Sequence, residues 1–123
     1  MSITLDRQGQ GLGSGSGAGA SALLFALVDN AASGDNTIVV ADATRKIKVQ
    51  SYVIVADAAV VARWKSGAGT SLSGAMSLAA NGGVAAASAA GTWLLETAVN
   101  QALVLNLGAA IGARGHVAYF LET

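Results

Sequence analysis

Alternating apolar and polar side chains mark the middle of this 123-residue chain. In KIKVQSYVIV, residues 46–55, most of the apolar residues fall on odd-numbered positions and most of the polar residues on even-numbered positions. The apolar set is Ile47, Val49, Val53 and Val55, and the polar set is Lys46, Lys48 and Gln50. A period of two is typical of a β-strand with one face buried. We therefore expect a strand whose apolar set faces the core and whose polar set faces water.

The next run, VVARWK at residues 60–65, predicts a second strand. Val60, Ala62 and Trp64 share the apolar side of this run, while Arg63 and Lys65 share the other side. Trp64 is therefore expected in the core. The short segment ADAA between the two runs is typical of a hairpin connection, so these strands are expected to pair antiparallel.

Four further short apolar runs lie between clusters of Gly, Asn, Asp or Ser. They are NTIVV at 36–40, WLLE at 93–96, ALVLNL at 102–107 and GHVAYFLE at 115–122. Many short strands with turn-rich connections predict an all-β chain, a single jelly-roll-like antiparallel β-sandwich. Helix is the alternative only over 75–90, where Ala favours it, but Gly82 and Gly83 interrupt that run.

The N-terminal segment differs in composition from the rest. Gly occupies every second position of QGQGLGSGSGAG at 8–19, a composition that leaves few side chains to build a core. We expect residues 1–20 to form an extended Gly-rich arm and residues 21–123 to form the sandwich domain. In MSITLDR at the start of the arm, Ile3 and Leu5 alternate ahead of Arg7. Such a segment can add to a sheet edge or dock in a groove, so these three residues are expected to contact a neighbouring subunit. An arm folded back on its own domain is the alternative.

Residues 70–93 are dominated by Ala, Ser and Gly. Small side chains allow another backbone to approach closely, so this stretch suits either a packed seam between subunits or an inner sheet face within one subunit. The composition leaves both open. Because an Ala-rich core removes little apolar area from water, we also expect an oligomer.

Composition excludes several classes of function. Seven basic residues balance seven acidic ones and Cys is absent, which argues against nucleic-acid binding, thiolate catalysis and sulfur-rich metal sites. The apolar run ALLFALV at 22–28 is too short for a membrane-spanning helix, so no membrane partner is expected.

The chain offers little for catalysis. His116 is the only histidine, and it shares strand parity with Ala118 and Phe120, so we expect a structural role for it. The acids Asp29, Asp35, Asp42 and Asp57 fall at expected turns, where Asp caps the backbone, and they form no acidic ladder for calcium. We expect no catalytic residue, no cofactor and no metal site, and therefore no enzyme.

The layout of the sandwich region resembles that of small virion structural proteins of tailed bacteriophages, including head decoration (cement) proteins. The resemblance covers residues 37–122. It rests on a strand followed by W-K-S-G, the segment LSGAMSLAANGG, and the terminal GHVAY strand. It implies a jelly roll, a homotrimer and no catalytic site; the Gly-rich arm has no counterpart.

Two main functions follow as expectations. In the first, the protein is a capsid decoration protein on the outer surface of the virion, where it binds the major capsid protein as a homotrimer and stabilises the head. The arm residues Ile3, Leu5 and Arg7 are then expected to contact the capsid. In the second, it is a tail or head fibre module that recognises host-surface glycan, with Trp93 as the contact, because aromatic rings stack on sugars. A non-viral adhesion subunit is a third, less specific alternative.

Overall fold

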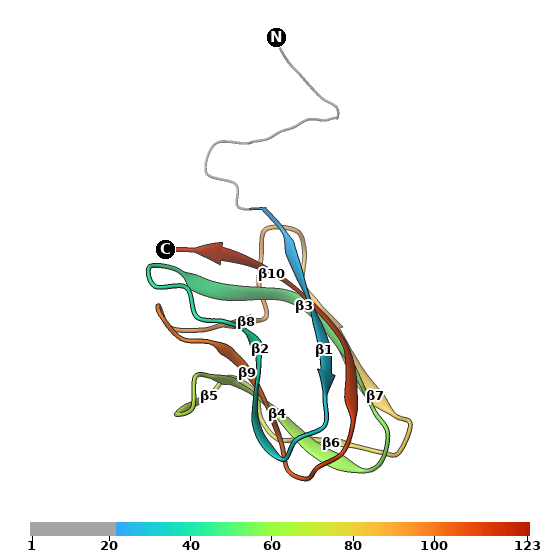
Figure 1. Cartoon of the computed structure of the whole chain (residues 1–123). Coiled ribbons are helices and arrows are strands. Elements are labelled where there is room, and N and C mark those ends of the chain that lie inside the picture. The colour runs from blue at the N-terminus through green and yellow to red at the C-terminus, as the bar shows by residue number, and fades with distance from the viewer. Residues whose placement is uncertain (1–21) are drawn as a thin grey trace.

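The computed structural model describes residues 22–123, which fold into two antiparallel sheets packed face to face (Figure 1). The first sheet contains β1 (Leu24–Asn30), β3 (Lys46–Ala56), β7 (Gly83–Ala87), β8 (Leu95–Glu96) and β10 (Ala113–Glu122). The second contains β2 (Gly34–Val39), β4 (Val60–Ser66), β5 (Thr70–Ser71), β6 (Met76–Leu78) and β9 (Leu103–Leu107). The expected arm, with Ile3, Leu5 and Arg7, lies outside the described residues.

The strand order confirms the jelly roll. The first sheet has the order β1-β10-β3-β7, with β8 also paired to β3, and the second has the order β2-β9-β4-β5, with β6 also paired to β4. The pairs β1–β10, β2–β9, β3–β7 and β4–β6 thus nest within one another along the chain, as in a long hairpin rolled into two sheets. Strands β6 and β7 occupy the stretch where helix was the alternative. Residues 22–123 contain no helix capable of spanning a lipid bilayer.

The expected hairpin between residues 46–55 and 60–65 is wrong, because β3 and β4 belong to different sheets. Both sides of β3 are already occupied, by β10 and by β7. At the end of β3, the amide of Ala56 donates to the carbonyl of Gly82 at 2.8 Å, and the amide of Asp57 donates to Gly112 at 2.9 Å. The connection therefore crosses from one sheet to the other.

The expected core face of β3 is only half right. Ile47 and Val49 are fully buried, as predicted, but Val53 is half-buried and Val55 is 45% exposed. In the second half of the strand the core position is taken by Ile54, which has no exposed surface.

A β-bulge explains this change of face. Val49 lies opposite Tyr119 of β10, and Ser51 lies opposite the adjacent Ala118. Gln50 is therefore an extra residue in β3, and it shifts the alternation of side chains by one. From Ser51 onward, every side chain faces the side opposite to the one that the alternation predicts.

The core lies between the two sheets, and Trp64 is its largest fully buried side chain, as predicted. Its ring meets that of Tyr52 from the opposite sheet edge to face, with centroids 5.2 Å apart. Trp64 is also paired across the strands with Leu105 of β9, which is equally buried. Aromatic and aliphatic side chains thus link the sheets at their centre.

Candidate functional site

The two outer faces of the sandwich differ in chemistry. The outer face of the β2-β9-β4 sheet is polar, and its side chains include Asp35, Asn106, Arg63 and Lys65 on neighbouring strands. Asp35 accepts a hydrogen bond from Asn106 at 2.7 Å and from Lys65 at 3.1 Å. These bonds, the one from Asn106 first, lower the pKa of Asp35. A face of this composition is typical of a sheet in contact with water.

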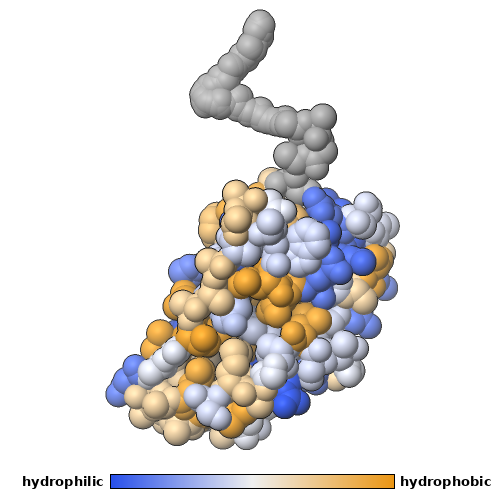
Figure 2. Space-filling model, turned by 180° about the vertical axis from the view of Figure 1, so that it is seen from behind, coloured by the Kyte–Doolittle hydropathy of each residue, from blue (hydrophilic) through white to orange (hydrophobic). Residues whose placement is uncertain are grey.

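The outer face of the β1-β10-β3-β7 sheet is largely apolar. Two rows of cross-strand neighbours run over it: Leu27–His116–Val53–Ala85 and Phe25–Ala118–Ser51–Ala87. We call these eight residues the outer band. Leu27 is 81% exposed, the largest fraction among the exposed large hydrophobic residues of the described chain, and Phe25 is 69% exposed. The space-filling view shows hydrophobic and weakly polar residues over much of its visible face, together with a strongly hydrophilic group in the upper part (Figure 2).

Side-chain size changes across the outer band. The bulky Phe25 and Leu27 stand on β1 at one edge of the sheet, and the small Ala85 and Ala87 stand on β7 at the other. A shallow hollow of about 350 Å³ lies over the small side, between β3, β7 and His116. The face therefore carries a projection on one edge and a depression toward the other.

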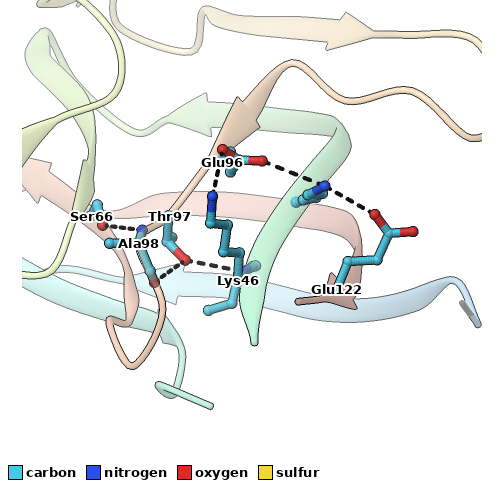
Figure 3. Close-up of polar contacts among 8 residues, drawn as sticks. Lys46, Ser66, Glu96, Thr97, Ala98 and Glu122 are labelled. Atoms are coloured by element: carbon cyan, nitrogen blue, oxygen red, sulfur yellow. Dashed lines mark hydrogen bonds and ion pairs between the residues drawn. The ribbon is translucent and has the colours of Figure 1, made fainter. Parts of the chain in front are cut away.

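The charges at the two ends of the outer band are paired within the chain. At one end Arg114 binds Asp57, with Nη1 2.6 Å from a carboxylate oxygen, and approaches Asp29 at 3.4 Å. At the other end Lys48 binds Glu122 at 2.9 Å and Glu96 at 3.5 Å. Lys46 also contacts Glu96, at 3.5 Å (Figure 3).

Trp93 covers this second end of the outer band. The Lys48 ammonium lies 3.9 Å from the centroid of the Trp93 ring, a cation–π contact, and the Phe120 ring packs against Trp93 edge to face with centroids 6.3 Å apart. Trp93 is 44% exposed, as expected, but one face of its indole already holds the cation. Lys48 is only 7% exposed, so the expectation that it lies on a wet face is wrong, because the chain before β8 folds over it.

A set of buried polar contacts, not found from the sequence, holds that covering segment in place. Thr97 is 1% exposed; its amide donates to the carbonyl of Ile47, and its hydroxyl oxygen accepts from the Ile47 amide, both at 2.9 Å. The next amide, that of Ala98, donates to the hydroxyl oxygen of Ser66 in the other sheet at 3.0 Å (Figure 3). Thr and Ser give no periodic signal, so only the folded backbone reveals this link.

His116 is exposed on the outer band between Leu27 and Val53, so the expectation of a satisfied structural histidine is wrong. It shares its parity with Ala118 and Phe120, which are buried at 4% and 6% exposure. The side chains at these alternate positions of β10 point away from the core between the sheets. Phe120 is buried because Trp93 packs over it. No group of three His, Cys, Asp or Glu within residues 22–123 is placed to hold a metal ion.

The predicted turn acids divide into two pairs. Asp42 and Asp57 do lie at turns, and Asp42 accepts from the amide of Thr44 at 3.0 Å. The Arg45 guanidinium, followed by that amide, lowers the pKa of Asp42. Asp29 and Asp35, in contrast, lie within β1 and β2, where they pair with basic side chains.

Comparison with protein-family models, with curated proteins and with solved structures finds no match for this chain.

The ion pairs of Lys48 predict a stability change at alkaline pH. The hydrogen bond to Glu122 raises the pKa of Lys48, and burial opposes it only in part. Because the folded pKa lies above the unfolded one, near 10.4, this contribution is fully present below about pH 10 and is lost as pH rises through the folded pKa. We expect the wild type to melt about 2–6 °C above Lys48→Met at pH 8, and this gap to narrow as pH rises past the unfolded pKa of lysine. Parallel melting curves from pH 8 to 12 would contradict the prediction.

Proposed function

We propose that this chain is a non-enzymatic structural protein of a bacteriophage virion, a decoration protein that binds the outer surface of the capsid as a homotrimer. The observation that carries the proposal is the outer band, a broad and largely apolar sheet face whose flanking charges are already paired. Large exposed apolar areas on a folded domain are typical of protein-binding surfaces. The resemblance of residues 37–122 to decoration proteins supports the virion as the setting.

The architecture agrees with this proposal without deciding it. Jelly rolls occur in viral capsid proteins, and they also occur in lectins and cupins. The outer band adds a physical reason for binding. Phe25 alone is 69% exposed, which costs about 1–2 kcal/mol relative to full burial of its side chain. A contact that covers this surface recovers that free energy.

In the proposed role, the protein stabilises the capsid by binding to it and catalyses no reaction. A ligand that binds only the assembled shell stabilises it by mass action, by about 2.7 kcal/mol per site at a concentration 100 times the Kd. Linking copies into an oligomer raises the effective concentration of each binding contact. The stabilisation of the head would then grow with the number of occupied sites on the major capsid protein.

Localisation and copy number on purified particles test the proposal. Particles from a producing culture would be labelled with a gold-conjugated antibody against the purified chain, and the copies per particle counted by gel densitometry. We expect label distributed over the whole head and a copy number in the hundreds. Absence from purified particles would overturn the proposal.

Label confined to the tail, in a few copies, would favour the fibre module instead. The observation that supports this second candidate is Trp93, which is 44% exposed at the end of the outer band. The Lys48 ammonium occupies one face of the Trp93 indole, so a sugar ring could stack only on the other face. In that case Trp93→Ala should abolish binding to host cells and leave the fold intact by circular dichroism.

A further inference from the structure

We infer that the outer band is a self-association surface, in which Phe25 and Leu27 of one copy fill the hollow over β3 and β7 of a second copy. The occupant is thus another molecule of this same chain. The inference uses the same outer band as the proposed function, but it is tested on the purified chain without capsids, so its failure is distinguishable from failure of the proposed function.

The distribution of side-chain size supports a second copy as the occupant. A half-turn about an axis that lies in the face and runs parallel to the strands places β1 of one copy over β7 of the other. The same operation places β7 over β1, so each contact is made twice. Phe25 and Leu27 then stand opposite Ala85 and Ala87, the large-on-small arrangement by which facing sheets interdigitate at about 10 Å.

The pairing of charges also suits this occupant. The two rows of the outer band contain His116 as their one titratable side chain, and the charged groups lie at the ends, where Arg114 and Lys48 already have carboxylate partners. Closing two such faces together therefore buries no unpaired charge. The outer face of the β2-β9-β4 sheet, with Arg63 exposed on it, does not meet this condition.

The area of this sheet face determines how strongly two copies are expected to associate. Four strands about 4.8 Å apart and about seven residues long give a footprint of about 450 Å² per copy, or about 900 Å² for a pair. Specific interfaces exceed about 1,000 Å². We therefore expect weak association in solution, detectable at tens to hundreds of micromolar. Because the contact is reciprocal it closes at two copies, so it would join chains in pairs and would not by itself build the proposed homotrimer.

Disulfide trapping tests the contact directly, because the chain has no cysteine. Leu27→Cys and Ala85→Cys would be prepared as separate proteins, mixed and oxidised. Within one chain these positions lie three strand spacings apart, about 14 Å, which is beyond the reach of a disulfide. We expect a cross-linked product from the mixture. The control pairs Ala85→Cys with Val61→Cys, a position 44% exposed on the other sheet. Cross-linking no faster than in this control overturns the inference.

Charge substitutions provide a second test. Leu27→Asp should weaken association at least tenfold in analytical ultracentrifugation, because it places a carboxylate in the apolar hollow, while Val61→Asp should leave association unchanged. Circular dichroism would verify that both variants fold. A mixture of Leu27→Asp with Ala85→Lys should associate more strongly than either variant alone. A wild type that stays monomeric at about 500 µM, or a Leu27→Asp variant that associates like the wild type, overturns the inference.

Discussion

Trp64→Ala is expected to lower the free energy of unfolding by about 3–5 kcal/mol, as for other large-to-small core substitutions. Trp64 has no exposed surface and lies at the centre of the interface between the sheets. It contacts Tyr52 of one sheet while belonging to the other, so its removal leaves a cavity that neither backbone can close. Urea unfolding followed by far-ultraviolet circular dichroism measures the effect.

Two further tryptophan variants make this prediction specific. The indole Nε1 of Trp64 is buried without a hydrogen-bond partner among the described residues, so Trp64→Phe removes an unsatisfied donor along with some volume. We expect Trp64→Phe to cost only about 1–2 kcal/mol. Trp93→Ala should cost about 1–2 kcal/mol, less than Trp64→Ala, because Trp93 is 44% exposed but packs on Lys48 and Phe120. Equal losses from Trp64→Ala and Trp93→Ala would contradict this account of the core.

Gly115→Ala is expected to destabilise the chain by about 2–5 kcal/mol, although it adds a single methyl group. Gly115 lies inside β10, between Val28 of β1 and Ile54 of β3. A Cβ at this position would collide with the backbone carbonyl oxygen of Val53. Its φ of +155° is also a conformation that side chains disfavour. Both strands would have to separate to admit the methyl group.

Gly74→Ala is the matched control for that experiment. No atom lies within 4 Å of a Cβ built at Gly74, and its φ is not positive, so we expect no loss of stability. Thermal melts of the two variants, measured side by side, give the comparison. A Gly115→Ala melting temperature within 2 °C of the wild type would show that β10 tolerates a side chain there.

The all-β fold class was predictable from the sequence, because the alternation of apolar and polar residues and the turn-forming clusters both arise from residues close together in the chain. The alternation around Trp64 placed that residue, Val60 and Ala62 in the core, where they lie. Turn-forming clusters marked the ends of several strands. Where a strand pairs with its neighbours without interruption, the parity of its side chains follows from the sequence alone.

The failures arise where the answer depends on distant strands. The bulge at Gln50 is a feature of the pairing between β3 and β10, and no local pattern in KIKVQSYVIV announces it. The hairpin expected at ADAA fails because β10 and β7 occupy both sides of β3. Phe120 points away from the core and is buried only because Trp93, which lies 27 positions earlier in the chain, packs over it.

The outer band was only partly accessible from the sequence. Phe25 and Leu27 lie in ALLFALV, an unbroken apolar run whose even and odd positions are both hydrophobic. Such a run indicates a strand that is buried on both faces, and one of those faces belongs to the core through Val28. The other face contains Phe25 and Leu27, which are exposed in the described chain, so the run signals an apolar surface but not what covers it.

The position of β10 within its sheet has a consequence for biosynthesis. It pairs with β1 on one side and with β3 on the other, although it is made after both. His116 and Ala118 of β10 complete the two rows of the outer band, so neither row exists until β10 has left the ribosome. Neighbouring nascent chains on one messenger RNA would therefore lack the finished surface. The two rows of the outer band would therefore form only after β10 has been made, later than β1, β3 and β7.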